Sequence, residues 1–183
     1  MDDQAAYEER VVQEDVRYDG HIIRVVEQTV ALPDGRRAKR DIVKHSGAVA
    51  ILAITQDDRM ILEKQWRAPV QAMTLEIPAG KIDQRDQSPE DAVVRELNEE
   101  TRMKAGKLEK IAGFYTSIGF SNEYMDLYLA TDLTPVATAL PQDDDEAIAL
   151  SYYTFDEMRA LYQSGELKDA KTLMAYFYWQ TMQ

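Results

Sequence analysis

The chain contains no cysteine, only two histidines and no long apolar run among its 183 residues. Because cysteine is absent, neither disulfide bonds nor a thiolate zinc site can form. No segment approaches the roughly 20 apolar residues that a membrane-spanning helix needs. The N-terminus, MDDQAAYEERVVQED, is acidic and lacks the apolar centre of a signal peptide. The sequence therefore predicts a cytoplasmic protein without a membrane partner.

Positive charge is also scarce in this sequence. The chain carries 21 Lys and Arg against 33 Asp and Glu, which gives a net charge of −12. Such an acidic chain is repelled by the phosphate backbone of nucleic acids and by anionic lipids, which argues against both as partners. A phosphorylated substrate would have to be received through metal ions and a few local cations. The length of 183 residues suits one domain with a sizeable core.

A helix is predicted after the loop that begins at Gly80, within the segment GKIDQRDQSPEDAVVRELNEETRM (80–103). Ser88 is a favourable N-cap, and Pro89 suits the first helical position. The apolar Val93 and Leu97 lie four residues apart and therefore share one face. We expect that face to be buried and the acidic side of the helix to point outward.

The acidic side of this helix predicts a metal site. Glu96 and Glu100 are four residues apart, so their side chains share a face, with Glu99 beside them. Carboxylate oxygens are the ligands that Mg²⁺ and Mn²⁺ prefer. Arg95, four residues before Glu99, can pair with it and hold one carboxylate in place. A solvated charged face is the alternative interpretation of the same residues.

The same segment resembles the sequence box of the Nudix hydrolase family: Gly, five residues, Glu, seven residues, then Arg-Glu-aliphatic-x-Glu-Glu-x-Gly-aliphatic. The matching positions are Gly80, Arg95, Glu96, Leu97, Glu99, Glu100 and Met103. Asp86 replaces the first Glu, the stretch to Arg95 is one residue longer, and Arg102 replaces the closing Gly. The first two departures lie in a loop, where an insertion costs little. Arg102 stands where the family has a residue free to adopt φ > 0, so the helix exit can run differently here.

Segments around the box resemble those of bacterial ADP-ribose pyrophosphatases over nearly the whole chain. They are 63–67 (EKQWR), 75–83 (LEIPAGKID), 116–123 (TSIGFSNE), 142–146 (QDDDE) and 164–172 (SGELKDAKT). These proteins commonly carry Pro where this chain has Ile118, a difference that bears on the substrate more than on the reaction. The resemblance implies magnesium-dependent hydrolysis of the pyrophosphate bond of a small nucleotide sugar, ADP-ribose, to AMP and ribose 5-phosphate.

The pattern of strands and helices predicts an α/β or α+β fold. Residues 21–32 are rich in β-branched side chains, turn at 33–36 (PDGR) and return over 38–44, which is a hairpin signal. Further strands are predicted at 48–55, 60–66, 111–116, 123–131 and 147–153, and helices after the capping box Thr154-x-x-Glu157 and over 169–181. The resemblance implies a Nudix α/β/α sandwich with a mixed sheet over about 46–183. It also implies an N-terminal antiparallel strand subdomain over about 1–45, which takes part in a homodimer.

The resemblance further implies roles for individual residues. The implied metal ligands are one main-chain carbonyl and several carboxylates, with Glu99 either a ligand or a partner of one: Ala79, Glu96, Glu99, Glu100 and Glu146. The general base would come from the acidic loop at Asp144, with Asp143 and Asp145 as alternatives. Arg95 would support the catalytic carboxylates, and Mn²⁺ could replace Mg²⁺.

Substrate contacts are implied at a second group of residues. Arg67 resembles a phosphate-facing arginine, with a surface ion pair as the alternative. Glu76 and Glu123 are candidates for the ribose hydroxyls. Ser117, Ile118 and Gly119 are candidates for main-chain contact with the substrate, and Lys81 is a further substrate-binding candidate. The residues that the resemblance puts near the adenine are His21, Ile22, Arg40, Asp41 and His45. For His21 and His45, a place on the surface or in the hairpin is the safer interpretation.

Three functions therefore stay open from the sequence. The first is a magnesium-dependent ADP-ribose pyrophosphatase. The second is a Nudix hydrolase of another nucleoside diphosphate sugar, which Ile118 favours. The third is a noncatalytic nucleotide-binding module that kept the fold, which Asp86 and Arg102 favour. Turnover of ADP-ribose beside other nucleotide sugars separates the first two, and ligand affinity without turnover defines the third.

Overall fold

The computed structural model describes residues 6–142 and 147–183 and divides into two compact units. The first unit is Met1–Gly47 with Tyr115–Tyr124, and the second is Ala48–Phe114 with Met125–Gln183. The acidic loop that contains the predicted base Asp144, its alternatives Asp143 and Asp145, and the predicted ligand Glu146 lies outside the described residues.

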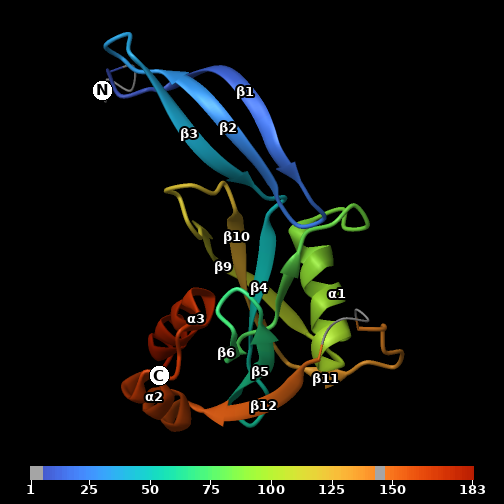
Figure 1. The fold of residues 1–183 in the computed structure, drawn as a ribbon. Coiled ribbons are helices and arrows are strands. Elements are labelled where there is room, and N and C mark those ends of the chain that lie inside the picture. The colour runs from blue at the N-terminus through green and yellow to red at the C-terminus, as the bar shows by residue number, and fades with distance from the viewer. Residues whose placement is uncertain (1–5, 143–146) are drawn as a thin grey trace. The chain divides into compact units, whose positions relative to one another are not determined.

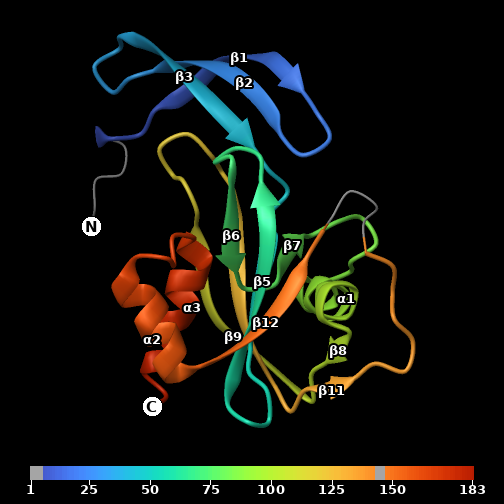
Figure 2. The ribbon, with the colours of Figure 1, turned by 60° about the horizontal axis from the view of Figure 1, so that its bottom comes forward.

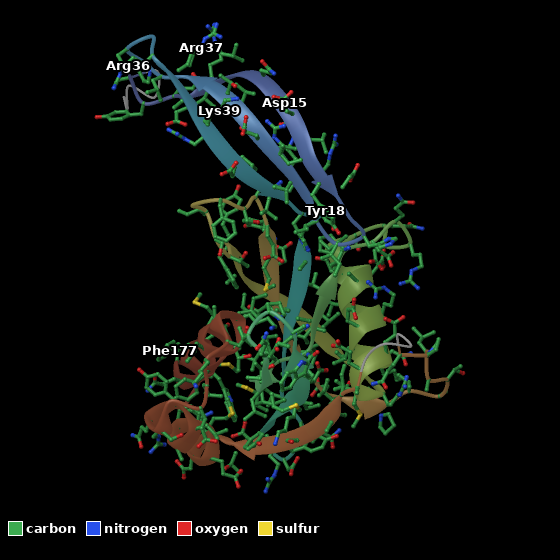
Figure 3. All side chains as sticks on the ribbon, viewed as in Figure 1. Asp15, Tyr18, Arg36, Arg37, Lys39 and Phe177 are labelled. Carbon is green, nitrogen blue, oxygen red and sulfur yellow. The ribbon has the colours of Figure 1, made fainter. Side chains whose placement is uncertain are left out.

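The first unit is built on an antiparallel sheet of β1 (Arg10–Asp19), β2 (Arg24–Ala31) and β3 (Arg37–Lys44), in that order (Figure 1). The predicted hairpin is confirmed, since β2 pairs with β3 along its whole length. Charged side chains pair across this sheet: Lys39 of β3, labelled in Figure 3, pairs with Glu27 of β2 at 2.6 Å, and Lys44 of β3 pairs with Glu14 of β1 at 2.5 Å. Strand β1, which hydrophobic alternation does not predict, pairs with β2 in antiparallel fashion, and Arg17 of β1 also pairs with Glu27 of β2 at 3.0 Å.

The second unit contains the remaining strands. They are β4 (Ala48–Ala53), β5 (Arg59–Arg67), β6 (Ala72–Glu76), β7 (Ala79–Lys81), β8 (Met103–Lys104), β9 (Lys107–Tyr115), β10 (Tyr124–Thr131), β11 (Thr134–Pro135) and β12 (Ala149–Thr154). They form sheets of order β7-β4-β10-β9, β12-β5-β6 and β11-β8. Strand β4 is parallel to β10 and antiparallel to β7, which confirms the predicted mixed sheet.

Three helices complete the described part of the second unit: α1 (Pro89–Thr101), α2 (Phe155–Ser164) and α3 (Ala170–Gln180). Each begins at a side-chain cap. Ser88 caps α1, and Thr154 forms a capping box with Glu157 at α2, both as predicted; Asp169 caps α3. Helix α1 lies on one side of the strands, whereas α2 and α3 lie on the other (Figures 1 and 2). This arrangement confirms the predicted α/β fold.

The core of the second unit consists of two apolar clusters separated by β4. Ala50 and Leu52 belong to the cluster that includes Trp179 of α3, whereas Val49 and Ile51 belong to the cluster packed on α1. Because successive side chains of a strand point to opposite faces, a strand buried on both faces reads as a continuous apolar run. Helix α3 buries Trp179 but leaves Phe177 42% exposed on its outer side (Figure 3). No helix within the described residues has the length and apolar character to cross a bilayer.

Two adjacent valines of α1 provide a test of this packing. Val93 is fully buried, whereas Val94 is 54% exposed. We expect Val93→Ala to lower the free energy of unfolding by about 2 kcal/mol, because two buried methyl groups are lost. Val94→Ala should leave it unchanged or raise it by about 0.5 kcal/mol, since alanine is the better helix former. Urea unfolding of both variants measures the difference, and equal effects would contradict the assigned helix face.

Candidate active site

Glu96 and Glu100 of α1 face the interior, so the expectation that this acidic side points outward is wrong for them. Glu96 is 8% exposed and Glu100 is 5% exposed, in the same range as the apolar residues around them. The physical reason is a polar partner inside the unit. The N–H of Ala79 donates to Oε2 of Glu100 at 3.2 Å, so this carboxylate lies against the main chain at the start of β7.

Gly80 makes the approach of Glu96 to the same strand feasible. A Cβ atom at position 80 would lie 1.8 Å from Oε1 of Glu96 and 2.0 Å from its Cδ. The carboxylate of Glu96 therefore occupies the space that any side chain at position 80 would fill. This contact gives a steric reason for the glycine that opens the sequence box.

Arg95 is the cation at the centre of this cluster. Its guanidinium donates to Oε1 of Glu96 at 2.7 Å, to Oε2 of Glu99 at 3.0 Å and to the carbonyl of Lys81 at 2.9 Å. The predicted pairing with Glu99 is thus confirmed. Asp86, followed by Glu96 and Glu99, raises the pKa of Arg95 well above its usual range, so the guanidinium stays charged. A fixed cation offsets part of the cost of burying these carboxylates.

Asp86, the shorter replacement for a box glutamate, binds Arg95 through both oxygens. The distances are 3.1 Å from Nε to Oδ1 and 2.9 Å from Nη2 to Oδ2. The carboxylate is 3% exposed, and the hydrogen bond from Arg95 lowers its pKa. The loop contains Asp86 and is one residue longer than in the box. It still brings a carboxylate into contact with Arg95.

Arg102 takes the backbone conformation that the box reserves for glycine. It caps α1 in the left-handed region, with φ 61° and ψ 23°, and its N–H donates to the carbonyl of Asn98 at 3.1 Å. The helix exit therefore follows the ordinary path despite the substitution, at a cost of about 1 kcal/mol for a residue with a Cβ. The guanidinium of Arg102 donates to the carbonyl of Leu140, which ties the following segment to the helix end.

A divalent cation at this place would bind the carboxylate oxygens of Glu96 and Glu100 and the carbonyl oxygen of Ala79. Within residues 6–142 and 147–183, no three acidic or histidine side chains gather closely enough to hold a metal by themselves. Two carboxylates and a main-chain carbonyl still form a hard-oxygen set that suits Mg²⁺ or Mn²⁺, since Mg²⁺ commonly keeps water and substrate phosphate as further ligands. The residues present therefore fit such an ion.

Arg67, the predicted phosphate contact, is bound to Glu76 in a bidentate pair. Its Nε and Nη2 donate to the two carboxylate oxygens at 2.7 and 2.8 Å. Oγ1 of Thr74 also donates to Glu76, at 2.7 Å, and so does the ammonium of Lys171. Burial would raise the pKa of Glu76, but the bonds from Arg67, Lys171 and Thr74 outweigh it and lower the pKa to about 2. Both carboxylate oxygens of Glu76 therefore already accept hydrogen bonds from protein side chains.

The sequence interpretation missed the contribution of the first turn of α3. Lys171 and Thr172 belong to segment 164–172 (SGELKDAKT), whose resemblance to ADP-ribose pyrophosphatases implies no role for either residue. A cavity of about 830 Å³ adjoins Arg67 on the same side of the unit. It lies between the β5–β6 connection and the α2–α3 connection, with Lys64, Lys168 and Asp169 among its lining residues.

In the first unit, two of the predicted residues lie together. The Nδ1 atom of His45 is 3.5 Å from Oε1 of Glu123, whose other oxygen accepts from Oγ1 of Thr116 at 2.5 Å. The His45 side chain is 8% exposed, so the surface interpretation is wrong for this histidine. The N–H of Gly47 donates to Nδ1 at 3.1 Å, which fixes the orientation of the ring.

The remaining predicted residues of the first unit are mostly exposed. Arg40 donates to both oxygens of Glu9, at 2.9 and 2.5 Å. Ile118 is 80% exposed in the loop after β9. Its neighbour Ser117 accepts at its carbonyl from the N–H groups of residues 120 and 121. The exposed group is completed by His21, Ile22, Asp41 and Gly119.

The chain is similar to known proteins over nearly its whole length. The NUDIX domain model matches residues 44–176. The ADP-ribose pyrophosphatase of Bacillus subtilis (strain 168) is 40% identical over 173 residues, which cover 94% of this chain and 93% of the relative. The methanol dehydrogenase activator of Bacillus methanolicus is 34% identical over 174 residues, or 95% and 94% of the two chains. A crystal structure of an ADP compounds hydrolase has a TM-score of 0.83 at 19% identity, covering 96% of this chain and 94% of that one, which shows a shared fold.

The chain therefore belongs to the Nudix family, and it is a Nudix hydrolase. The matched range contains the whole segment 80–103, with the α1 carboxylates, Gly80 and Arg95. The fold expected from the resemblance, a mixed α/β structure of the Nudix type, is confirmed.

Lowering the pH is expected to weaken the fold partly through Glu76. Its pKa falls from 4.5 to about 2 on folding, so the ionised carboxylate contributes stability that is present above pH 4.5 and is lost as the pH falls toward about 2. The Glu76→Gln variant cannot titrate, so its free energy of unfolding should fall less steeply over this range. Urea unfolding at several pH values measures both slopes. Equal slopes would show that the bonds to Arg67 and Lys171 contribute no such linkage.

Proposed function

We propose that this protein is an ADP-ribose pyrophosphatase that uses Mg²⁺, or Mn²⁺, to hydrolyse ADP-ribose to AMP and ribose 5-phosphate. One observation carries the proposal: the carboxylates of Glu96 and Glu100 lie on the main chain of Ala79 and Gly80, buried beside the cation of Arg95. The full-length similarity to a protein named ADP-ribose pyrophosphatase supports the substrate.

The bound cation would neutralise the diphosphate and polarise its phosphorus. Glu96, Glu100 and the Ala79 carbonyl would hold it, together with Glu146 of the acidic loop and with Glu99 as a ligand or a partner of one. Arg95 keeps Glu96 and Glu99 in place. A carboxylate of the loop, Asp144 with Asp143 and Asp145 as alternatives, would accept the proton of the attacking water.

On the substrate side, Arg67 would contact a phosphate oxygen, and Lys81 would add local positive charge. Glu76 and Glu123 would meet the ribose hydroxyls, and the loop 117–119 would contact the substrate through its main chain. The adenine would lie near His21, Ile22, Arg40, Asp41 and His45. The N-terminal strand region would take part in a homodimer. Arg67 is 42% exposed beside its bond to Glu76, so its guanidinium still reaches solvent.

A second substrate class is favoured by one residue. Ile118 stands, 80% exposed, where ADP-ribose-cleaving relatives commonly have Pro. A nucleoside diphosphate sugar other than ADP-ribose is therefore the alternative substrate. Turnover of ADP-ribose and GDP-mannose side by side, under the same metal conditions, decides between them.

The first test uses purified protein, ADP-ribose and excess Mg²⁺, with AMP as the measured product. We expect wild type to release AMP and Glu100→Gln to be slower by about 100-fold or more, because the variant loses a carboxylate that would hold the cation facing the developing phosphoryl charge. Gln keeps the size and one acceptor oxygen of Glu100, so the urea midpoint should not fall.

Glu109→Gln, on the exposed face of β9, makes the same charge change and should keep full activity. Near-normal turnover by Glu100→Gln would overturn the metal assignment, and ligand affinity without turnover in wild type would indicate a noncatalytic module.

Gly80→Ala tests the steric contact directly. The atoms nearest to its Cβ would be those of the Glu96 carboxylate, the far end of a flexible side chain, so the fold can adapt by moving that carboxylate. We expect little change in the urea midpoint and a loss of about 100-fold in AMP release, since a shift of about 1 Å in a catalytic group has that effect. Gly35→Ala, in the β2–β3 turn, is the matched glycine variant, and it should affect stability alone, because its φ is 85°. Unchanged turnover by Gly80→Ala would show that the position of Glu96 does not matter.

A further inference from the structure

The first turn of α3 contains two buried polar residues that the proposed reaction does not use. Lys171 is 9% exposed and Thr172 is fully buried. Placing an ammonium group in the interior is costly unless anions surround it. Lys171 has two such partners: Oε2 of Glu76, and Oδ1 of Asp169 at 3.2 Å.

Glu76 connects Lys171 to Arg67. One carboxylate accepts two hydrogen bonds from the guanidinium of Arg67 and one from the ammonium of Lys171. A bidentate pair fixes the plane of the guanidinium as well as its position. The orientation of Arg67 is therefore set by a residue on α3, more than 100 positions along the chain.

The charges explain why a second cation is needed here. A carboxylate bound to Arg67 alone would cancel much of the positive potential that a phosphate could meet. Lys171 neutralises Glu76 from the buried side, so the half-exposed guanidinium keeps its attraction for an anion. Asp169, which also caps α3, balances part of the charge of Lys171.

Thr172 binds the main chain of Ile77, the residue that follows Glu76. Its Oγ1 accepts from the N–H of Ile77 at 2.9 Å and donates to Oδ2 of Asp169 at 2.6 Å. Ile77 is fully buried and lies two residues before Ala79, whose carbonyl is a proposed metal ligand. The same turn of α3 thus contacts Glu76 through one side chain and Ile77 through the next.

We propose that Lys171 and Thr172 are positioning residues: Lys171 sets Arg67 for phosphate binding through Glu76, and Thr172 holds the main chain that leads to Ala79. The proposal rests on the proposed function in taking Arg67 to meet a phosphate. Lys171→Met should weaken the binding of inorganic pyrophosphate in the presence of Mg²⁺ by about tenfold or more, the size of one charge-assisted hydrogen bond. Isothermal titration measures this affinity. With ADP-ribose, the same variant should raise KM more than it lowers kcat.

A double-variant cycle identifies the route through Arg67. In an Arg67→Ala background, Lys171→Met should change pyrophosphate affinity by less than about twofold, because the group that it positions is gone. Lys171→Arg should restore most of the affinity, since it keeps the charge. Lys107→Met, which removes a lysine whose side chain is 78% exposed, should have no effect. If Lys171→Met fails to fold, Lys171→Gln keeps the length and a donor without the charge, and the same weakening is expected of it.

Several outcomes would overturn the proposal. They are wild-type affinity in Lys171→Met or Lys171→Gln, equal losses with and without Arg67, and the absence of pyrophosphate binding by wild type. Failure of the proposed function is a separate result: wild type would then bind pyrophosphate but release no AMP from ADP-ribose. In that case the affinity cycle still decides the role of Lys171. For Thr172, loss of turnover in Thr172→Val with recovery in Thr172→Ser supports the assigned contact, and equal activity of the two contradicts it.

Discussion

The contact between α1 and β7 is the constraint on which the candidate site depends. Two carboxylates four residues apart lie against a main chain whose side chain is absent at Gly80. Ionised groups in such a place need a nearby cation, because burial alone disfavours their charged form. Arg95 provides it from the same helix, one residue before Glu96. Gly80 of β7 therefore leaves the room for the Glu96 carboxylate, and α1 supplies both the carboxylates and the cation beside them.

The net charge of −12 makes the two internal cation centres important for an anionic substrate. Arg95 is surrounded by Asp86, Glu96 and Glu99, so it serves chiefly to hold carboxylates. Arg67 binds the carboxylate of Glu76, and Lys171 binds the same carboxylate. A diphosphate would therefore meet attraction at Arg67, while the carboxylates around Arg95 would attract a divalent cation. Under the proposed function, the two arginines would therefore serve opposite tasks although both bind carboxylates.

Much of this could be predicted from local sequence rules. The caps at Ser88 and Thr154, the hairpin of β2 and β3 and the two-sided burial of β4 follow from patterns a few residues long. The inward direction of Glu96 could not be predicted this way, because it depends on Gly80, sixteen positions earlier in the chain. The contact of Lys171 with Glu76 spans a still longer separation and left no periodic signal. Local rules describe elements, whereas the site is made of contacts between elements.

The C-terminal end of α1 shows how one helix can organise more than its own carboxylates. The side chain of Asn98 donates to the carbonyl of Thr138 at 3.2 Å and accepts from the N–H of Leu140 at 3.0 Å. The carbonyl of Arg102 accepts from the N–H of Val136 at 3.0 Å, and its guanidinium donates to Leu140. The left-handed conformation at Arg102 costs about 1 kcal/mol, and a glycine would avoid that cost but could not reach Leu140. Arg102, the residue that departs from the box, thus contacts the segment 136–140, which precedes the acidic loop in the sequence. Helix α1, which contains Glu96 and Glu100, therefore also anchors the chain before that loop.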